Sequence, residues 1–191
     1  MSTALTVLSE DEQLFKEMVS DFAQKSLKPH VAEMDAKAEF KPEIVKQFFD
    51  LDIMGIEIPE NYGGVGASFF MSILAVEALS EVDASAGVMV DVQNTLVNNA
   101  FIRWGTEDQK QRYLTKLASE WVGAYALSEA GSGSDAFGLA TTAKDEGDHF
   151  LLNGRKLWIT NANEANVFIV IANTNKELGY KGITAFIVER G

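Results

Sequence analysis

A serine- and glycine-rich segment in the second half of the sequence offers several groups that could bind a ligand. Its residues are Tyr125-Ala126-Leu127-Ser128-Glu129-Ala130-Gly131-Ser132-Gly133-Ser134-Asp135. Serine hydroxyls and backbone N–H groups lie close together here with no bulky side chain among them, which suits an anionic or heteroaromatic ligand. The same composition fits a solvent-exposed connecting loop equally well, and both interpretations stay open.

A second segment, Leu157-Trp158-Ile159-Thr160-Asn161, combines a large flat ring with a hydroxyl group. We expect a strand over residues 156–160. Because side chains alternate between the two faces of a strand, Trp158 and Thr160 would lie on the same face. A flat ring beside a donor suits a planar ligand with hydrogen-bonding edges. A tryptophan and a threonine on one strand face are also common as the core and rim of a sheet.

Other potential sites have less support. His30 and His149 lie far apart and lack the spacing of metal ligands or of a catalytic triad, so we interpret both as structural or surface residues. The glycines of Gly63-Gly64-Val65-Gly66 do not follow a strand in a βαβ unit, which favours turn residues over a dinucleotide fingerprint.

Composition excludes several classes of protein. The 191 residues include 16 Lys and Arg against 28 Asp and Glu, and this net charge of −12 argues against nucleic acid as the main partner. The absence of cysteine excludes disulfides, thiolate nucleophiles, zinc–thiolate sites and iron–sulfur clusters.

Apolar runs such as 167–172 are far shorter than a membrane span, so we expect no membrane-spanning segment. Residues 1–7 resemble no signal or transit peptide, which favours the cytoplasm of a bacterium over the mitochondrial matrix.

The elements that must position these groups change in type near residue 120. Capping boxes at Ser9 to Glu12 and Thr106 to Gln109 predict two helix starts, and Pro42 suits a third. We expect helices over 9–28, 42–55, 69–79, 85–102 and 106–117, the fourth of them buried on most faces. We expect strands over 121–127, 139–143, 149–152, 156–160, 167–172 and 183–188.

The pattern predicts an α+β fold with an N-terminal all-α helical domain at 1–120 and an antiparallel β-sheet or barrel domain at 121–191. Asn153-Gly154 is a strong hairpin signal between two of the expected strands. Because Gly191 follows the last strand directly and an open sheet edge is a liability, we expect the β domain to be incomplete.

Three motifs, at 125–135, 152–161 and 180–188, together with 55–64 and 105–110, resemble the acyl-CoA dehydrogenase family in order and spacing. The resemblance covers essentially the whole chain. Residues 82–85, 93–96 and 179–182 look most like the short/branched-chain members, which oxidise short and 2-methyl-branched acyl-CoA thioesters in fatty acid metabolism and branched-chain amino acid degradation.

The resemblance implies that two of these segments contact FAD. The residues concerned are Tyr125, Ala126, Leu127, Ser128, Glu129, Ala130, Gly131, Ser132, Gly133, Ser134, Trp158, Ile159 and Thr160. It places Ser128 near the pyrimidine edge of the flavin and the Thr160 hydroxyl near N5, which receives the hydride. Ser134 and Tyr180 are expected to contact the acyl-CoA substrate.

The resemblance also implies a reaction. A carboxylate base removes the α proton of the thioester, the β hydride passes to the flavin, and a 2-enoyl-CoA remains, with electrons leaving through an electron-transfer flavoprotein. In the family the base lies in a C-terminal helical domain, which we expect to be absent from this chain, so we assign no catalytic residue here. Glu129 matches a position that shapes the cofactor loop, and the full-length protein is expected to form a homotetramer.

Three alternatives remain open on the sequence. The chain could be a non-catalytic interaction module derived from the family, or one half of an enzyme split between subunits. It could also be part of a flavin oxidase that reduces oxygen directly. The retention of all three motifs favours the dehydrogenase over the interaction module.

Overall fold

The computed structural model describes residues 7–191. The interpretation that the N-terminus lacks a targeting signal concerns residues that lie almost wholly outside this range. The chain divides into two compact units, one ending at Glu120 and the other running from Trp121 to Gly191. No helix within the described range is long and apolar enough to cross a membrane.

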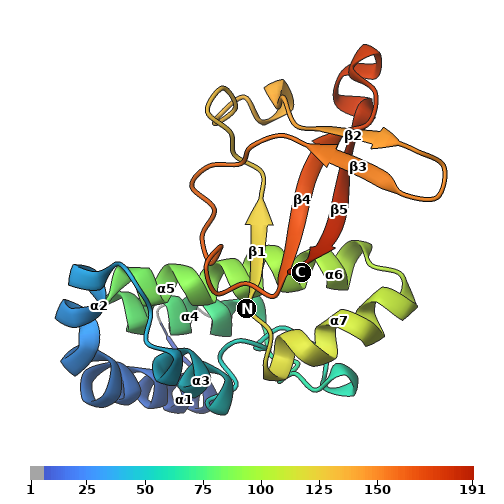
Figure 1. Ribbon diagram of the computed structural model, residues 1–191. Helices are drawn as coiled ribbons and strands as arrows, with labels where there is room; N and C mark the ends of the chain where they lie inside the picture. Colours follow the sequence, from blue (N-terminus) through green and yellow to red (C-terminus); the bar gives the residue numbers. More distant parts are fainter. Residues whose placement is uncertain (1–6) are drawn as a thin grey trace. The chain divides into compact units, whose positions relative to one another are not determined.

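The first unit is helical (Figure 1). Its α-helices are α1 (Glu10–Phe22), α2 (Val31–Lys37), α3 (Pro42–Asp50), α4 (Phe69–Ser80), α5 (Ala84–Asp91), α6 (Asn99–Trp104) and α7 (Glu107–Ser119). Tighter or wider helical turns are η1 (Ala23–Leu27), η2 (Lys28–His30), η3 (Glu60–Tyr62) and η4 (Val92–Asn98). The core includes fully buried Phe48, Leu79 and Leu114.

Both predicted capping boxes are confirmed. The Ser9 hydroxyl accepts a hydrogen bond from Glu12 N while the Glu12 carboxylate accepts one from Ser9 N, and Thr106 and Gln109 do the same at α7.

The expected end of α3 at Gly55 is wrong, because the helix ends at Asp50 and Asp52 takes a left-handed φ of 58°. Lys28-Pro29 does not end the helical chain either, since η2 leads directly into α2 and proline is tolerated in a first helical turn.

The expected buried helix over 85–102 is interrupted by the π-helical turn η4. Asn94 in this turn accepts a hydrogen bond from Ile56 N at 3.0 Å and donates to Ile53 O at 2.8 Å. Asn98 donates to Met54 O at 2.9 Å. These buried amides satisfy backbone groups of a segment that forms neither helix nor strand, and a π turn is a common way to re-aim side chains within a helix.

The second unit contains a five-stranded sheet in which β4 is the central strand (Figure 1). Its strands are β1 (Gly123–Ala126), β2 (Thr142–Asp145), β3 (Phe150–Asn153), β4 (Val167–Asn173) and β5 (Ile183–Glu189). β4 runs parallel to β1 and to β2, and antiparallel to β5. The α+β class is confirmed, but the sheet is mixed and not purely antiparallel. The long stretch between β1 and β4 allows the crossover that a parallel pair needs.

The hairpin expected at Asn153-Gly154 is wrong. The hairpin in the structure joins β2 to β3, with Asp145 opposite Phe150 and the turn at Gly147, whose φ is 96°. Gly154 does not have a positive φ. A Cβ at this position would lie 2.2 Å from Thr141 Oγ1, so glycine is required because the chain passes close to Thr141.

We expect Gly154→Ala to destabilise the second unit by roughly 2–3 kcal/mol, because the added methyl group overlaps Thr141. Gly131→Ala is the matched control, since its added Cβ meets no atom within 4 Å and its φ is not positive. Urea unfolding followed by circular dichroism measures both changes. Equal stabilities of the two variants would contradict the close approach at Gly154.

Candidate functional site

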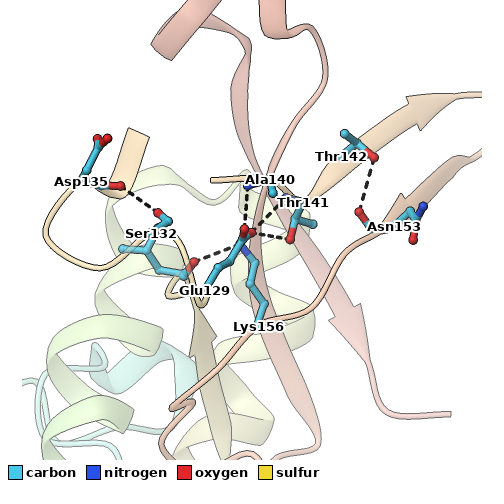
Figure 2. A network of polar contacts seen from close by, with 9 residues as sticks. Glu129, Ser132, Asp135, Ala140, Thr141, Thr142, Asn153 and Lys156 are labelled. Atoms are coloured by element: carbon cyan, nitrogen blue, oxygen red, sulfur yellow. Dashed lines mark hydrogen bonds and ion pairs between the residues drawn. The ribbon is translucent and has the colours of Figure 1, made fainter. Parts of the chain in front are cut away.

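A buried carboxylate lies at the centre of the candidate site. Glu129 and Ser132 face each other across a tight turn, with Glu129 N donating to Ser132 O at 2.9 Å and Ser132 N donating to Glu129 O at 3.1 Å. The Ser132 hydroxyl donates to Asp135 O at 2.8 Å. These bonds give the serine- and glycine-rich segment a defined turn, as Figure 2 shows.

The Glu129 carboxylate accepts four hydrogen bonds (Figure 2). The donors are Ala140 N at 2.6 Å, Thr141 N at 3.0 Å, the Thr141 hydroxyl and Lys156 Nζ at 2.8 Å. Burial by itself would raise the pKa of Glu129, but these hydrogen bonds outweigh it and lower the pKa to about 2. The side chain is therefore a fixed anion at neutral pH.

Lys156 joins the serine- and glycine-rich segment to the segment that contains Trp158 and Thr160. Its ammonium group donates to Glu129 Oε1 and, at 3.0 Å, to Leu127 O. The next residue continues this contact, because Leu157 N donates to Ser128 O at 2.9 Å. The structure thus places residues 127–129 and 156–157 side by side.

The strand expected over 156–160 does not form, so the argument that Trp158 and Thr160 share a strand face is wrong. Trp158 has a left-handed φ of 59°, and its side chain is 92% exposed. Asn161 has a φ of 66° and is buried, with Nδ2 donating to Gly123 O at 3.1 Å. A bulky residue in the left-handed region is uncommon, and such strain is concentrated at functional sites.

The donors near these segments fit a planar heteroaromatic group. In the part of the chain that the structure describes, the hydroxyls of Ser128, Ser134 and Thr160 make no hydrogen bond. Cβ atoms built at Gly131 and Gly133 meet nothing within 4 Å, so a ligand can approach the backbone closely there. Together with the exposed Trp158 ring, these groups match the isoalloxazine ring of FAD, which has a flat face and hydrogen-bonding edges.

The remaining predicted site residues lie around this centre. Tyr125 and Ala126 belong to β1, and burial raises the pKa of the Tyr125 phenol, so it stays neutral. Leu127 and Ile159 are half-buried, and Ala130 is exposed.

Tyr180 lies in the turn η6 (Lys176–Gly182), with its ring 6.0 Å from the ring of Phe137 in η5 (Ala136–Gly138). This contact brings the third motif next to the end of the serine- and glycine-rich segment.

Sequence reasoning did not single out Lys156, Thr141 or Phe137. A lysine directly before the apolar residues 157–159, together with an acidic residue in a loop of small residues, could have indicated the Lys156–Glu129 pair. No such pattern in the sequence indicates Thr141 or Phe137, because their contacts with Glu129 and Tyr180 form only when distant parts of the chain meet in the folded unit.

We expect Glu129→Gln to change the acid sensitivity of the second unit. The pKa of Glu129 is about 2 in the folded protein, below the ordinary 4.5. The ionised carboxylate therefore contributes its full stabilisation of the folded state above pH 4.5, and this contribution is lost as the pH falls toward 2. The variant should be less stable than the parent at about pH 7, by roughly 3 kcal/mol, and the difference should shrink between pH 4.5 and 2.

Urea unfolding at a series of pH values measures this difference. Glu146→Gln is the control, because Glu146 pairs with Lys144 at the surface and should contribute less than about 1 kcal/mol at any pH. If the stability difference between Glu129→Gln and the parent stays constant down to about pH 2, the lowered pKa of Glu129 would be contradicted.

Two family models match this chain. The N-terminal domain of acyl-CoA dehydrogenase matches residues 9–120, and the middle domain of acyl-CoA dehydrogenase matches residues 124–191. A probable short/branched chain specific acyl-CoA dehydrogenase from Dictyostelium discoideum is 53% identical over 186 residues, covering 97% of this chain and 45% of the relative.

Solved structures agree with these matches. One described as the electron transferring flavoprotein of Acidaminococcus fermentans has a TM-score of 0.93 at 40% identity, covering 100% of this chain and 50% of that chain. A glutaryl-CoA dehydrogenase from Mycobacterium smegmatis in complex with FADH2 has a TM-score of 0.87 at 33% identity, covering 95% and 46%. The chain spans about half the length of the relatives it matches. It belongs to the acyl-CoA dehydrogenase family of oxidoreductases, of which it carries the N-terminal and middle domains.

Proposed function

We propose that this chain is part of an FAD-dependent enzyme that converts short or 2-methyl-branched acyl-CoA thioesters into 2-enoyl-CoA. One observation carries the proposal: residues 127–134 and 156–160, far apart in sequence, are joined by hydrogen bonds and present unpaired hydroxyls beside an exposed indole ring. The glutaryl-CoA dehydrogenase relative was solved with FADH2, which supports FAD as the cofactor of the protein that contains this chain.

When bound, FAD supplies an acceptor for the hydride that leaves the β carbon of the thioester. The protein's part is to place donors where negative charge develops, since fixed donors stabilise such charge at little reorganisation cost. Thr160 Oγ1 and Ser128 Oγ are the two hydroxyls free to donate to the ring edges, and Trp158 provides a flat surface for stacking.

The acyl-CoA side of the site is formed by Ser134, Tyr180 and Phe137. Ser134 is exposed and has a free hydroxyl, and the Tyr180 and Phe137 rings form an exposed aromatic pair. A free hydroxyl and a pair of aromatic rings suit a thioester with a short acyl chain and a polar pantetheine arm. The Dictyostelium relative supports short or branched substrates.

Glu129 does not act as the base that removes the α proton. Its carboxylate is buried, already accepts four hydrogen bonds and has a pKa lowered to about 2, so it is a weak base. We assign the base to no residue of this chain.

The electron acceptor is an electron-transfer flavoprotein, and the full-length protein is a homotetramer. The first part of this proposal is supported by the match to a structure described as an electron transferring flavoprotein. The second rests on the family resemblance alone.

The natural protein that contains this chain should carry flavin and lose its visible flavin absorption when 2-methylbutanoyl-CoA or butanoyl-CoA is added without oxygen. Reduction should proceed in stopped-flow mixing without any acceptor protein. Persistence of the oxidised flavin spectrum with every short acyl-CoA tried would refute the proposed reaction.

We expect Thr160→Val to slow flavin reduction roughly 10- to 100-fold, because it removes one donor from the ring edge while keeping the side-chain shape. Binding of acyl-CoA should weaken much less. Thr184→Val is the matched control, since Thr184 is an exposed strand residue of β5 outside the site. Rapid-mixing rates and dissociation constants for both variants separate the two effects, and an unchanged reduction rate would remove Thr160 from the mechanism.

A further inference from the structure

We propose that Lys156 and Glu129 are positioning residues whose buried ion pair holds the two segments that face the cofactor, 127–134 and 156–160, in their binding arrangement. The inference rests on the proposed function, because it concerns how this chain prepares the place for the flavin. It goes beyond that function by assigning a role to two side chains that need not touch the cofactor.

The first argument is the pattern of contacts between the two segments. In the described part of the chain, three hydrogen bonds join them: Lys156 Nζ to Leu127 O, Lys156 Nζ to Glu129 Oε1, and Leu157 N to Ser128 O. Two of the three depend on the Lys156 ammonium group. Loss of this group leaves one backbone hydrogen bond to hold the segments together.

The second argument is where the pair lies. The side chains of Lys156 and Glu129 are only 11% and 6% exposed, whereas those of the neighbouring pair Lys144–Glu146 are 72% and 36% exposed. A buried pair is a poor source of net stability, because desolvation cancels much of the attraction, but breaking it leaves an uncompensated charge. Such a pair therefore strongly favours one arrangement of the chain over others.

The third argument is backbone strain at Trp158. Its left-handed φ is strained for a bulky residue and persists only if the flanking chain is held. Lys156 and Leu157 hold one side of this residue, and Asn161, bonded to Gly123 O, holds the other. Releasing Lys156 would let Trp158 relax and would move the indole and the Thr160 hydroxyl together.

The consequence is a preorganised site. A cofactor that meets groups already in place does not lose affinity to ordering them, so removing the ion pair should weaken binding by letting the two segments lose their arrangement. Glu129 also fixes residues 140–141 through Ala140 N and Thr141 N, so the pair connects the site to the start of β2.

The decisive variant is the double substitution Glu129→Gln/Lys156→Met in the intact natural protein. It leaves no unpaired buried charge, so it should be destabilised less than Glu129→Gln alone, which leaves Lys156 without its carboxylate partner. The single amide oxygen of glutamine can still accept from Thr141 N, while the donor from Ala140 loses its acceptor. The matched control is Glu146→Gln/Lys144→Met, which removes an exposed pair from the same unit.

The flavin is removed, the apoproteins are titrated with FAD, and dissociation constants and visible flavin spectra are recorded. We expect the double variant to bind FAD roughly 10- to 100-fold more weakly and to show a shifted spectrum for the bound flavin. The control variant should match the parent in both. Urea unfolding of each apoprotein measures stability separately from cofactor binding.

Each outcome bears on one of the two proposals. A folded double variant with the parent's FAD affinity and spectrum would overturn the positioning role while leaving the proposed function intact. A parent protein that binds no FAD would overturn the proposed function itself. If the double variant fails to fold, the single variant Lys156→Met is titrated instead, and parent-like affinity in its folded fraction would equally overturn the role.

Discussion

An ionised carboxylate inside a protein must be surrounded by donors, and in the second unit this requirement organises the site. Glu129 receives its four hydrogen bonds from Ala140, Thr141 and Lys156, which belong to two segments remote from its own. Because an unsatisfied buried charge is very costly, these segments cannot separate independently. The close passage of Gly154 by Thr141 belongs to the same arrangement, since any larger residue would push away one of the donors.

The helical unit solves a related problem with neutral groups. The segment from Ile53 to Ile56 is buried yet forms neither helix nor strand, so its backbone polar atoms need partners from elsewhere. Asn94 and Asn98 supply them from one face of a helix whose π turn directs both amides inward. In both units, therefore, side chains inside the core replace the regular backbone pairing that an irregular segment lacks.

Local signals in the sequence predict local structure well. The capping boxes at Ser9 and Thr106 need only residues three positions apart, and both form as expected. The parallel pairing of β1 with β4 depends on contacts across more than 40 residues, which no local pattern encodes. The hairpin predicted at Asn153-Gly154 does not form because glycine can be required for either of two reasons. Here it allows close packing against Thr141 and does not form a turn with positive φ. The strand predicted to align Trp158 with Thr160 does not form, because the chain turns into the left-handed region at Trp158.

The left-handed backbone at Trp158 sets two requirements that few residues can meet together. The backbone conformation favours glycine or asparagine, whereas a flat apolar surface requires an aromatic ring. β-Branched residues satisfy neither requirement. Most residues exposed as fully as this one tolerate almost any substitution, yet position 158 should be as restricted in residue type as a position in the core.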